Sequence, residues 1–207
     1  MCAELHRLAR GLRRHRFPFD PSVFPRNGIY LLFEDGEGGH DGDRIVRVGT
    51  HTGPNQLRSR VQQHFIKENK DRSIFRKHIG RALLRRDGDP LAPLWELDLT
   101  AAEARKKNAG WGDQVWLAKI EKLVTARIQQ RFSFVVLEVP EKEERLRLES
   151  RLISTVSLCE ECCASPGWLG LMSPKERIRE SGLWLINELY KEPLSEDDMT
   201  HLRRGGA

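Results

Sequence analysis

Residues 28–34 read Gly-Ile-Tyr-Leu-Leu-Phe-Glu, and residues 44–49 read Arg-Ile-Val-Arg-Val-Gly. Both stretches are short and rich in β-branched, aromatic and other apolar residues, which favours strands. Residues 35–43 lie between them and consist mainly of glycine and aspartate, a composition typical of a hairpin loop. The sequence therefore predicts an antiparallel hairpin at 28–49, with 35–43 as its loop.

The chain beyond this hairpin alternates between helical and strand patterns. Apolar spacing and breakers predict helices over 57–65, 74–84, about 113–130 and 142–157, a third strand over 132–139, and an irregular insertion at 87–111. We therefore expect an α/β protein of the α+β type, in which a small antiparallel three-stranded sheet is flanked by helices.

The two ends of the chain differ from this core. Leucines at helical spacing with arginines between them predict a basic helix over residues 3–15, and the prolines that follow predict a linker. The stretch from 158 onward mixes Cys, Pro, Gly and Trp, which is typical of packed irregular structure. We expect a helix and linker in 1–26, a core in 27–157 and a packed extension in 158–207.

Composition sets the broad class of protein. Lys and Arg number 35 against 30 Asp and Glu in 207 residues, a net charge of +5 that attracts phosphate only where the positive groups cluster. No stretch approaches the roughly 20 apolar residues that span a bilayer, and the N-terminus lacks a secretory signal pattern. Four cysteines do not make a disulfide scaffold. We expect a cytoplasmic protein without membrane contact.

Short motifs in chain order resemble the GIY-YIG nuclease family. They are Gly-Ile-Tyr at 28–30, Arg-Val-Gly at 47–49, and the helical stretch Leu-Arg-Ser-Arg-Val-Gln-Gln-His-Phe at 57–65. A third strand and a glutamate-bearing helix follow, as in that family. Each motif alone is weak, but their order and spacing are specific. The resemblance covers about residues 27–155 and implies a GIY-YIG-like fold and DNA endonuclease activity.

The resemblance also implies a catalytic set made of Tyr30, Arg60, His64 and Glu149. A carboxylate such as Glu149 suits Mg²⁺ or Mn²⁺, which implies hydrolysis by a one-metal mechanism. Arg60 suits charge developing on a phosphate, Tyr30 is expected to activate water, and His64 lies one helical turn from Arg60. A different role for Glu149 is an ion pair with Arg145 on the same helix.

This sequence departs from the family pattern at two places. Arg47 stands where the family usually has a tyrosine; it can hold a phosphate but cannot relay a proton, and His51 is expected to assist as an accessory residue. An asparagine that many members carry after the glutamate helix has no counterpart before Asn187, although Gly167 stands nearby in sequence. These departures motivate an alternative function, a catalytically impaired nucleic-acid-binding or protein-interaction module.

DNA contact is expected through backbone phosphates, because basic residues decorate the two helices that follow the hairpin. The residues assigned to this surface are Arg58, Arg72, Arg76, Lys77 and Arg81.

The cysteines Cys159, Cys162 and Cys163 form the remaining cluster in the sequence. A zinc site would need a fourth ligand and preferably a second paired spacing, and the chain has no second pair. We interpret them as buried structural thiols; the alternative is a metal knuckle completed by a distant histidine.

Overall fold

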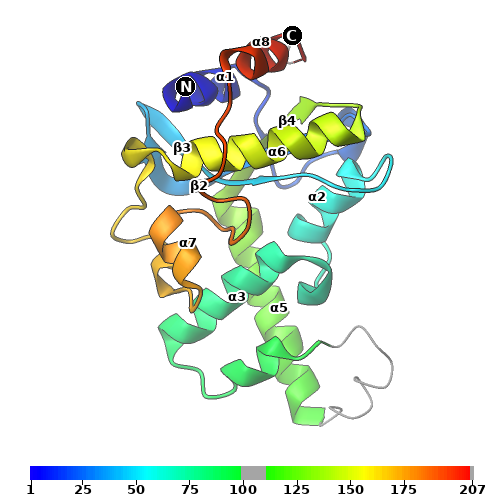
Figure 1. Cartoon of the computed structure of the whole chain (residues 1–207). Helices are drawn as coiled ribbons and strands as arrows, with labels where there is room; N and C mark the ends of the chain where they lie inside the picture. Colours follow the sequence, from blue (N-terminus) through cyan, green and yellow to red (C-terminus); the bar gives the residue numbers. More distant parts are fainter. Residues whose placement is uncertain (99–110, 206–207) are drawn as a thin grey trace.

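A computed structural model describes residues 1–98 and 111–205, drawn in colour in Figure 1. The α+β class is confirmed: a small antiparallel sheet lies between two groups of helices. The expected insertion at 87–111 lies partly outside the described residues. Its described part contains a short 3-10 helix, η3 (Ala92–Glu96). Among the described helices, none is both long enough and apolar enough to cross a membrane.

The sheet is fully antiparallel. Its order is β1-β4-β2-β3, so β2 lies between β4 and its hairpin partner β3. The strands are β1 (His15–Arg16), β2 (Gly28–Gly39), β3 (Gly42–Gly49) and β4 (Phe132–Glu138).

Two details of the expected sheet are wrong. The sheet has four strands, because the two-residue β1 pairs with β4; so short a strand carries no periodicity that a sequence pattern can reveal. The residues expected as a loop mostly belong to the hairpin, whose turn is only His40 and Asp41, both with positive φ. Gly36, with φ +91°, lies where the register of the two strands shifts, so the glycines serve an irregular ladder.

Both faces of the sheet are buried. Tyr30 and Leu32 pack into one apolar cluster, and the alternate residues Ile29, Leu31 and Phe33 pack into another. Because helices cover both faces, β2 shows a continuous apolar run in place of alternation. One face carries α2 (Leu57–Phe65), α3 (Ile74–Asp87) and α5 (Trp111–Arg131), and the other carries α1 (Cys2–Gly11), α6 (Lys142–Ser157) and α8 (Glu196–Gly205).

The helix ends follow local chemistry. The Ser73 side chain accepts a hydrogen bond from the Arg76 N–H at the start of α3, and Gly88 ends that helix in the left-handed conformation. Helix α6 has the predicted bounds. Helix α1 ends at Gly11, four residues earlier than expected, since Leu12 is already extended. Two short 3-10 helices, η1 (Pro21–Val23) and η2 (Lys70–Arg72), lie before β2 and before α3.

The C-terminal stretch is more helical than its composition indicated. It contains η4 (Glu160–Cys162), η5 (Leu169–Met172), α7 (Glu176–Ser181) and α8. The sequence of α8 is mostly polar, so its few apolar residues did not predict a helix. Met199 and Leu202, which are three residues apart, are nevertheless buried on one face of that helix. Irregular segments connect these helices.

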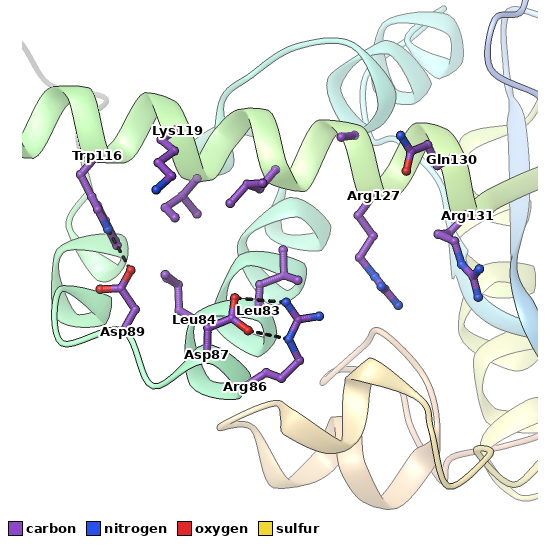
Figure 2. Close-up of a pocket in the computed structure, with 13 residues that line it drawn as sticks. Leu83, Leu84, Arg86, Asp87, Asp89, Trp116, Lys119, Arg127, Gln130 and Arg131 are labelled. Carbon is purple, nitrogen blue, oxygen red and sulfur yellow. Dashed lines mark hydrogen bonds and ion pairs between the residues drawn. The ribbon is translucent and has the colours of Figure 1, made fainter.

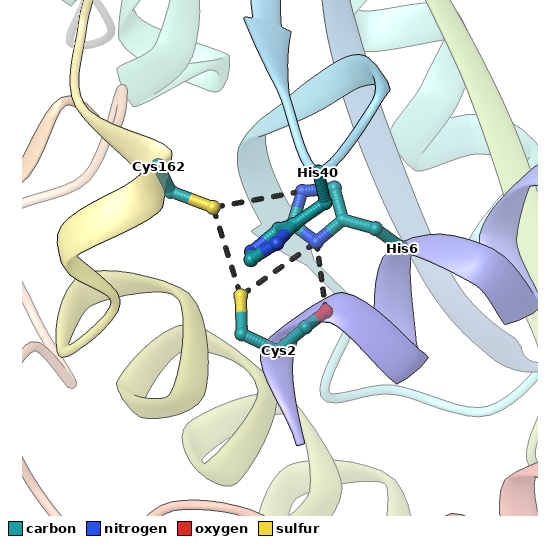
Figure 3. A group of neighbouring side chains, drawn as sticks. All are labelled: Cys2, His6, His40 and Cys162. Carbon is teal, nitrogen blue, oxygen red and sulfur yellow. Dashed lines mark hydrogen bonds between the residues drawn. The ribbon is translucent and has the colours of Figure 1, made fainter.

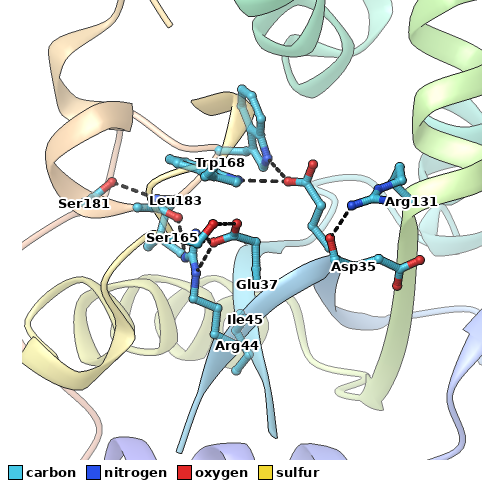
Figure 4. Close-up of polar contacts among 12 residues, drawn as sticks. Asp35, Glu37, Arg44, Ile45, Arg131, Ser165, Trp168, Ser181 and Leu183 are labelled. Atoms are coloured by element: carbon cyan, nitrogen blue, oxygen red, sulfur yellow. Dashed lines mark hydrogen bonds and ion pairs between the residues drawn. The ribbon is translucent and has the colours of Figure 1, made fainter. Parts of the chain in front are cut away.

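Buried carboxylates on β2 hold this C-terminal stretch in place. The Glu34 side chain accepts hydrogen bonds from Trp168 Nε1 (2.9 Å), Trp184 Nε1 (3.0 Å) and Arg127 Nη2 (2.6 Å). Figure 4 shows the neighbouring set, in which Glu37 accepts from Arg44 and from Ser165. The backbone N–H of Trp184 donates to the Val46 carbonyl of edge strand β3 at 2.8 Å. These bonds satisfy buried charge and fix the path of residues 165–184.

The two motif glycines are required by close approach. A Cβ on Gly49 would overlap the hydroxyl and ring of its cross-strand partner Tyr30. A Cβ on Gly28 would overlap the carbonyl of Leu137 on β4. At position 49, only glycine leaves room for the ring and hydroxyl of Tyr30 to pack against β3.

We therefore expect Gly49→Ala to destabilise the protein by about 1–3 kcal/mol, because the added methyl displaces Tyr30 from a packed site. Urea denaturation measures the change. Gly167→Ala is the matched control, since Gly167 is exposed and a Cβ there meets nothing within 4 Å. Equal unfolding free energies for the two variants would contradict the packing argument.

Candidate functional site

A buried hydrogen-bond chain begins at Tyr30, the third residue of β2. The Tyr30 hydroxyl lies 2.7 Å from His64 Nε2, and His64 Nδ1 lies 2.7 Å from Ser73 Oγ. His64 is on α2, and Ser73 caps α3. Tyr30 is 1% exposed and His64 is 0% exposed. The strand, the helix and the cap together fix the phenol and the imidazole in one orientation.

His64 is neutral in this setting. Burial lowers the pKa of His64 well below its usual range, and the positive charges of Arg60 and Arg47 lower it further. A neutral imidazole has one donor and one acceptor nitrogen. In the tautomer whose Nδ1–H donates to Ser73 Oγ, Nε2 is the nitrogen that accepts the hydrogen bond from the Tyr30 hydroxyl.

Glu149 reaches the same region from α6. Its Oε1 accepts a hydrogen bond from the Thr50 N–H at 3.0 Å, directly after the strand that carries Gly49. Burial raises the pKa of Glu149, whereas Arg47, the Thr50 N–H and Arg60 oppose that rise. The carboxylate is therefore held at a position where its charge is costly.

The ion pair between Glu149 and Arg145 is not formed. Arg145 is buried and donates instead to the carbonyls of Val139, Pro140 and His51. It joins the end of β4 to the segment after β3, so its role is to hold the backbone beside the site.

Two neighbouring cavities meet at Glu149. A cavity of about 300 Å³ is lined by both Arg60 and Glu149, together with Thr50, His51, Gln56, Ser59 and Gln63. A cavity of about 490 Å³ shares Glu149 and Leu146 with it and is lined by Arg47, His78, Asn187 and Glu188. Arg60 donates from Nη1 to Gln63 Oε1 and to the Arg72 carbonyl, which orients its guanidinium.

The two expected accessory residues have structural partners. Arg47 is 4% exposed and donates from Nη1 to the carbonyl of Trp184 in the C-terminal stretch, while its Nε is buried without a hydrogen-bond partner among the described residues. His51 has both ring nitrogens on backbone groups, with Nδ1 2.7 Å from the Gly53 carbonyl and Nε2 3.4 Å from the Gly28 N–H. His51 also lines the smaller of the two cavities, and Arg47 lines the larger one.

Sequence reasoning missed three contributors. Thr50 holds Glu149 through its backbone N–H, Ser73 holds His64, and Asn187 lines the larger cavity beside Glu149. Asn187 was too distant in sequence to assign; an asparagine after the glutamate helix is the family signal that points to it. Gly167, the nearer position, lines neither cavity.

The five residues assigned to DNA contact differ in their exposure and in their partners. Arg76 is wrong for that role, because it is fully buried and pairs with Glu121 at 2.6 Å. Its helical position did not reveal that α5 covers this face. Of the others, Arg72 is exposed and adjoins Arg60, whereas the remaining three donate to protein groups: Arg58 to Phe24, Lys77 to Glu96 and Arg81 to Glu96.

A cavity larger than either of the two at Glu149 lies elsewhere. It measures about 520 Å³ and is formed between α3 and α5, with Lys119, Arg127 and Arg131 along α5 (Figure 2). The Arg86–Asp87 ion pair lies on its other side. None of the expected catalytic residues lines it, so size alone does not identify the site.

The fold and the site define a class of small α+β protein in which a Tyr–His pair, an arginine and a carboxylate converge at the end of a β-hairpin. A family model described as the GIY-YIG domain matches residues 3–204. The chain therefore belongs to the GIY-YIG family, a nuclease family. The match is wider than the 27–155 stretch that carries the motifs. In the other two comparisons, no curated protein and no solved structure matches the chain.

The raised pKa of Glu149 makes a prediction for stability. A carboxyl whose folded pKa exceeds its unfolded pKa stabilises the fold below the unfolded value, about 4.3, and loses that contribution as pH rises through the folded value. We expect Glu149→Gln to be more stable than the wild type at pH 7, by about 0.5–2 kcal/mol, with the difference vanishing below about pH 4.

Denaturation at pH 7 and pH 4 measures this difference. Glu144→Gln is the matched control from the same helix, because a hydrogen bond from Arg147 lowers the pKa of Glu144 and its replacement should not stabilise the protein. A Glu149→Gln variant that is less stable than the wild type at pH 7 would contradict the conclusion that burial of the charged Glu149 carboxylate destabilises the fold.

Proposed function

We propose that this protein is a metal-dependent endonuclease that hydrolyses phosphodiester bonds of DNA. The observation that carries the proposal is the convergence of Arg60 and Glu149 on one cavity beside the buried Tyr30–His64 pair. Membership of a nuclease family supports the reaction type. The exposed basic residue Arg72, whose backbone carbonyl accepts a hydrogen bond from Arg60, supports a polyanionic substrate.

Glu149 is the residue that would hold a divalent ion. Its Oε1 is oriented by Thr50, and among the described residues its Oε2 has no hydrogen-bond partner. A single hard oxygen ligand fits Mg²⁺ or Mn²⁺, which keep several waters and bind phosphate oxygens. When bound, such an ion supplies charge stabilisation to the phosphoryl oxygens. It would also offset the burial that raises the pKa of Glu149.

Tyr30 and His64 would move the proton. Neutral His64 accepts the Tyr30 hydroxyl proton at Nε2 while its Nδ1–H stays on Ser73. The Tyr30 oxygen then takes a proton from the attacking water. Tyr30 packs on Gly49, and the next residue, Thr50, holds Glu149, so the phenol and the carboxylate are linked through adjacent residues of one strand end.

Arg60 would bind the reacting phosphate. Its guanidinium is always protonated and offers a planar set of donors, which suits charge that grows on phosphoryl oxygens. Hydrogen bonds to Gln63 and the Arg72 carbonyl occupy one terminal nitrogen, Nη1. Its other donors have no hydrogen-bond partner in the part of the chain that the structure describes, so they could bind the substrate.

A second function, binding without cleavage, is favoured by one observation. The residue at the family's second tyrosine position, Arg47, is buried and bonded to Trp184, so no second phenol assists Tyr30. In that case the chain would bind nucleic acid or a protein partner through the same surface. Cleavage assays distinguish the two functions.

Cleavage of plasmid and single-stranded DNA tests the proposal directly. We expect the wild type to cut with Mg²⁺ or Mn²⁺ and to stop when the ion is chelated. Glu149→Gln and Arg60→Ala should each lose about 100-fold or more, because each removes charge stabilisation from the transition state. Tyr30→Phe keeps the ring packing and should lose about 10²–10⁴-fold through the missing proton transfer.

The variant Glu188→Gln is the activity control, since Glu188 lines the neighbouring cavity without a proposed role. Cutting by Glu149→Gln at the wild-type rate would overturn the assignment of the site. A folded wild type that binds DNA but cuts no substrate with either ion would establish the binding function instead.

The exposed arginine beside the site gives a prediction for binding. We expect Arg72→Ala to weaken DNA affinity and to reduce the slope of log K against log salt by about 0.9, as for one lost phosphate contact. Arg86→Ala is the control, because Arg86 pairs with Asp87 near the other end of α3. Titrations across salt concentrations measure both slopes. Equal slopes for both variants and the wild type would exclude Arg72 from the interface.

A further inference from the structure

A second group of chemically reactive side chains lies away from Glu149. Cys2 and His6 on α1, His40 in the turn between β2 and β3, and Cys162 in η4 have ligand atoms that all lie within 4.8 Å of one another. Figure 3 shows these side chains pointing toward a common point from three separate elements. Cys2 and His6 are one helical turn apart, so they share a face of α1.

The distances fit a tetrahedral zinc ion. Bond lengths of 2.3 Å to sulfur and 2.0–2.1 Å to nitrogen place neighbouring ligand atoms of a tetrahedron about 3.8 Å apart for two sulfurs and about 3.6 Å for sulfur and nitrogen. The Cys2 and Cys162 Sγ atoms are 3.6 Å apart, and Cys162 Sγ is 3.8 Å from His6 Nε2.

Each histidine is oriented through its other ring nitrogen. His6 Nδ1 lies 3.0 Å from the Cys2 carbonyl, and His40 Nδ1 lies 3.3 Å from a Glu161 carboxylate oxygen. Metal-bound histidines in proteins have this pattern, in which an oxygen partner fixes the tautomer and leaves Nε2 for the ion. His6 Nε2 is also 3.1 Å from the Ile45 N–H, a contact that the ion would replace.

The cluster is largely buried, with Cys2 half-buried. His6 is 0% exposed, Cys162 is 3% exposed, and the His40 side chain is 4% exposed. Two thiols and two imidazoles are a poor filling for an apolar core, since their hydrogen-bonding groups need partners. A cation at their centre would bind one atom of each of the four side chains, in place of the Cys2–Cys162 and Cys162–His6 contacts and the contact from the Ile45 N–H.

We propose that Cys2, His6, His40 and Cys162 form a structural Zn²⁺ site. Soft thiolate and imidazole ligands select zinc over the hard ions suited to Glu149, and four protein ligands leave no open position for a substrate. Binding displaces the two thiol protons to solvent and changes no oxidation state. The ion joins the N-terminal helix and the hairpin turn to the start of the C-terminal stretch.

This site differs from both interpretations of the three clustered cysteines, which were buried structural thiols and, as the alternative, a metal knuckle completed by a distant histidine. Only Cys162 of the three clustered cysteines is a ligand. Cys163 is exposed and donates to the Glu160 carbonyl, and Cys159 Sγ contacts His40 Nε2 at 3.2 Å from outside the four-ligand set.

Metal analysis of the full chain, purified without an N-terminal tag and with Zn²⁺ as the probe, tests the proposal. We expect about one zinc per chain, a chelator-induced fall in melting temperature of more than about 5 °C, and zinc affinity at least about 100-fold weaker in Cys162→Ser and His40→Gln. Replacing zinc by Co²⁺ should give the absorption of a tetrahedral thiolate site.

The control variant Cys163→Ser should keep zinc, as should Glu149→Gln, which separates this site from the proposed nuclease centre. A wild type that neither carries nor takes up zinc would overturn the proposal, as would a Cys2–Cys162 disulfide in the protein isolated under reducing conditions. Zinc lost in Cys159→Ser but kept in His6→Ala would also overturn it, since the ligand set would then be different.

Discussion

The packing of the Tyr30 ring against Gly49 sets the geometry on which the rest of the site depends. Because Gly49 on β3 has no side chain, the Tyr30 ring packs closely against that strand, and its hydroxyl contacts His64 on α2. The residue after Gly49 then presents its N–H to Glu149 on α6. The contact between Tyr30 and Gly49 thereby positions His64 and Glu149 relative to each other, although their helices α2 and α6 cover opposite faces of the sheet.

Burial adjusts the two titrating groups of the site in opposite directions. It lowers the pKa of His64 and raises the pKa of Glu149, so burial disfavours the charged form of each. The arginines Arg47 and Arg60 make the imidazole still less basic but favour the carboxylate. A neutral base and an ionisable ligand can therefore lie near each other without competing for a proton.

The C-terminal stretch completes the site while it covers the sheet. Trp184 bonds to Glu34, to the Val46 carbonyl and to Arg47, so one residue anchors the stretch to β2 and β3. Three residues later, Asn187 lines the cavity that Glu149 also lines. The proposed zinc site would fix the beginning of the same stretch through Cys162. Both attachment points, Cys162 and Trp184, lie in the C-terminal stretch, outside the Gly-Ile-Tyr and Arg-Val-Gly motifs of the hairpin.

The sequence by itself determined the hairpin, the bounds of α6 and the order of Tyr30, Arg60, His64 and Glu149, because apolar periodicity and motif spacing are local properties of a chain. It did not determine that Arg76 is buried against Glu121, that Arg47 binds Trp184, or that β1 adds a fourth strand. Nor did it bring Cys2 to Cys162, 160 positions away. Burial and long-range contacts depend on which helix covers which face, and only tertiary packing decides that.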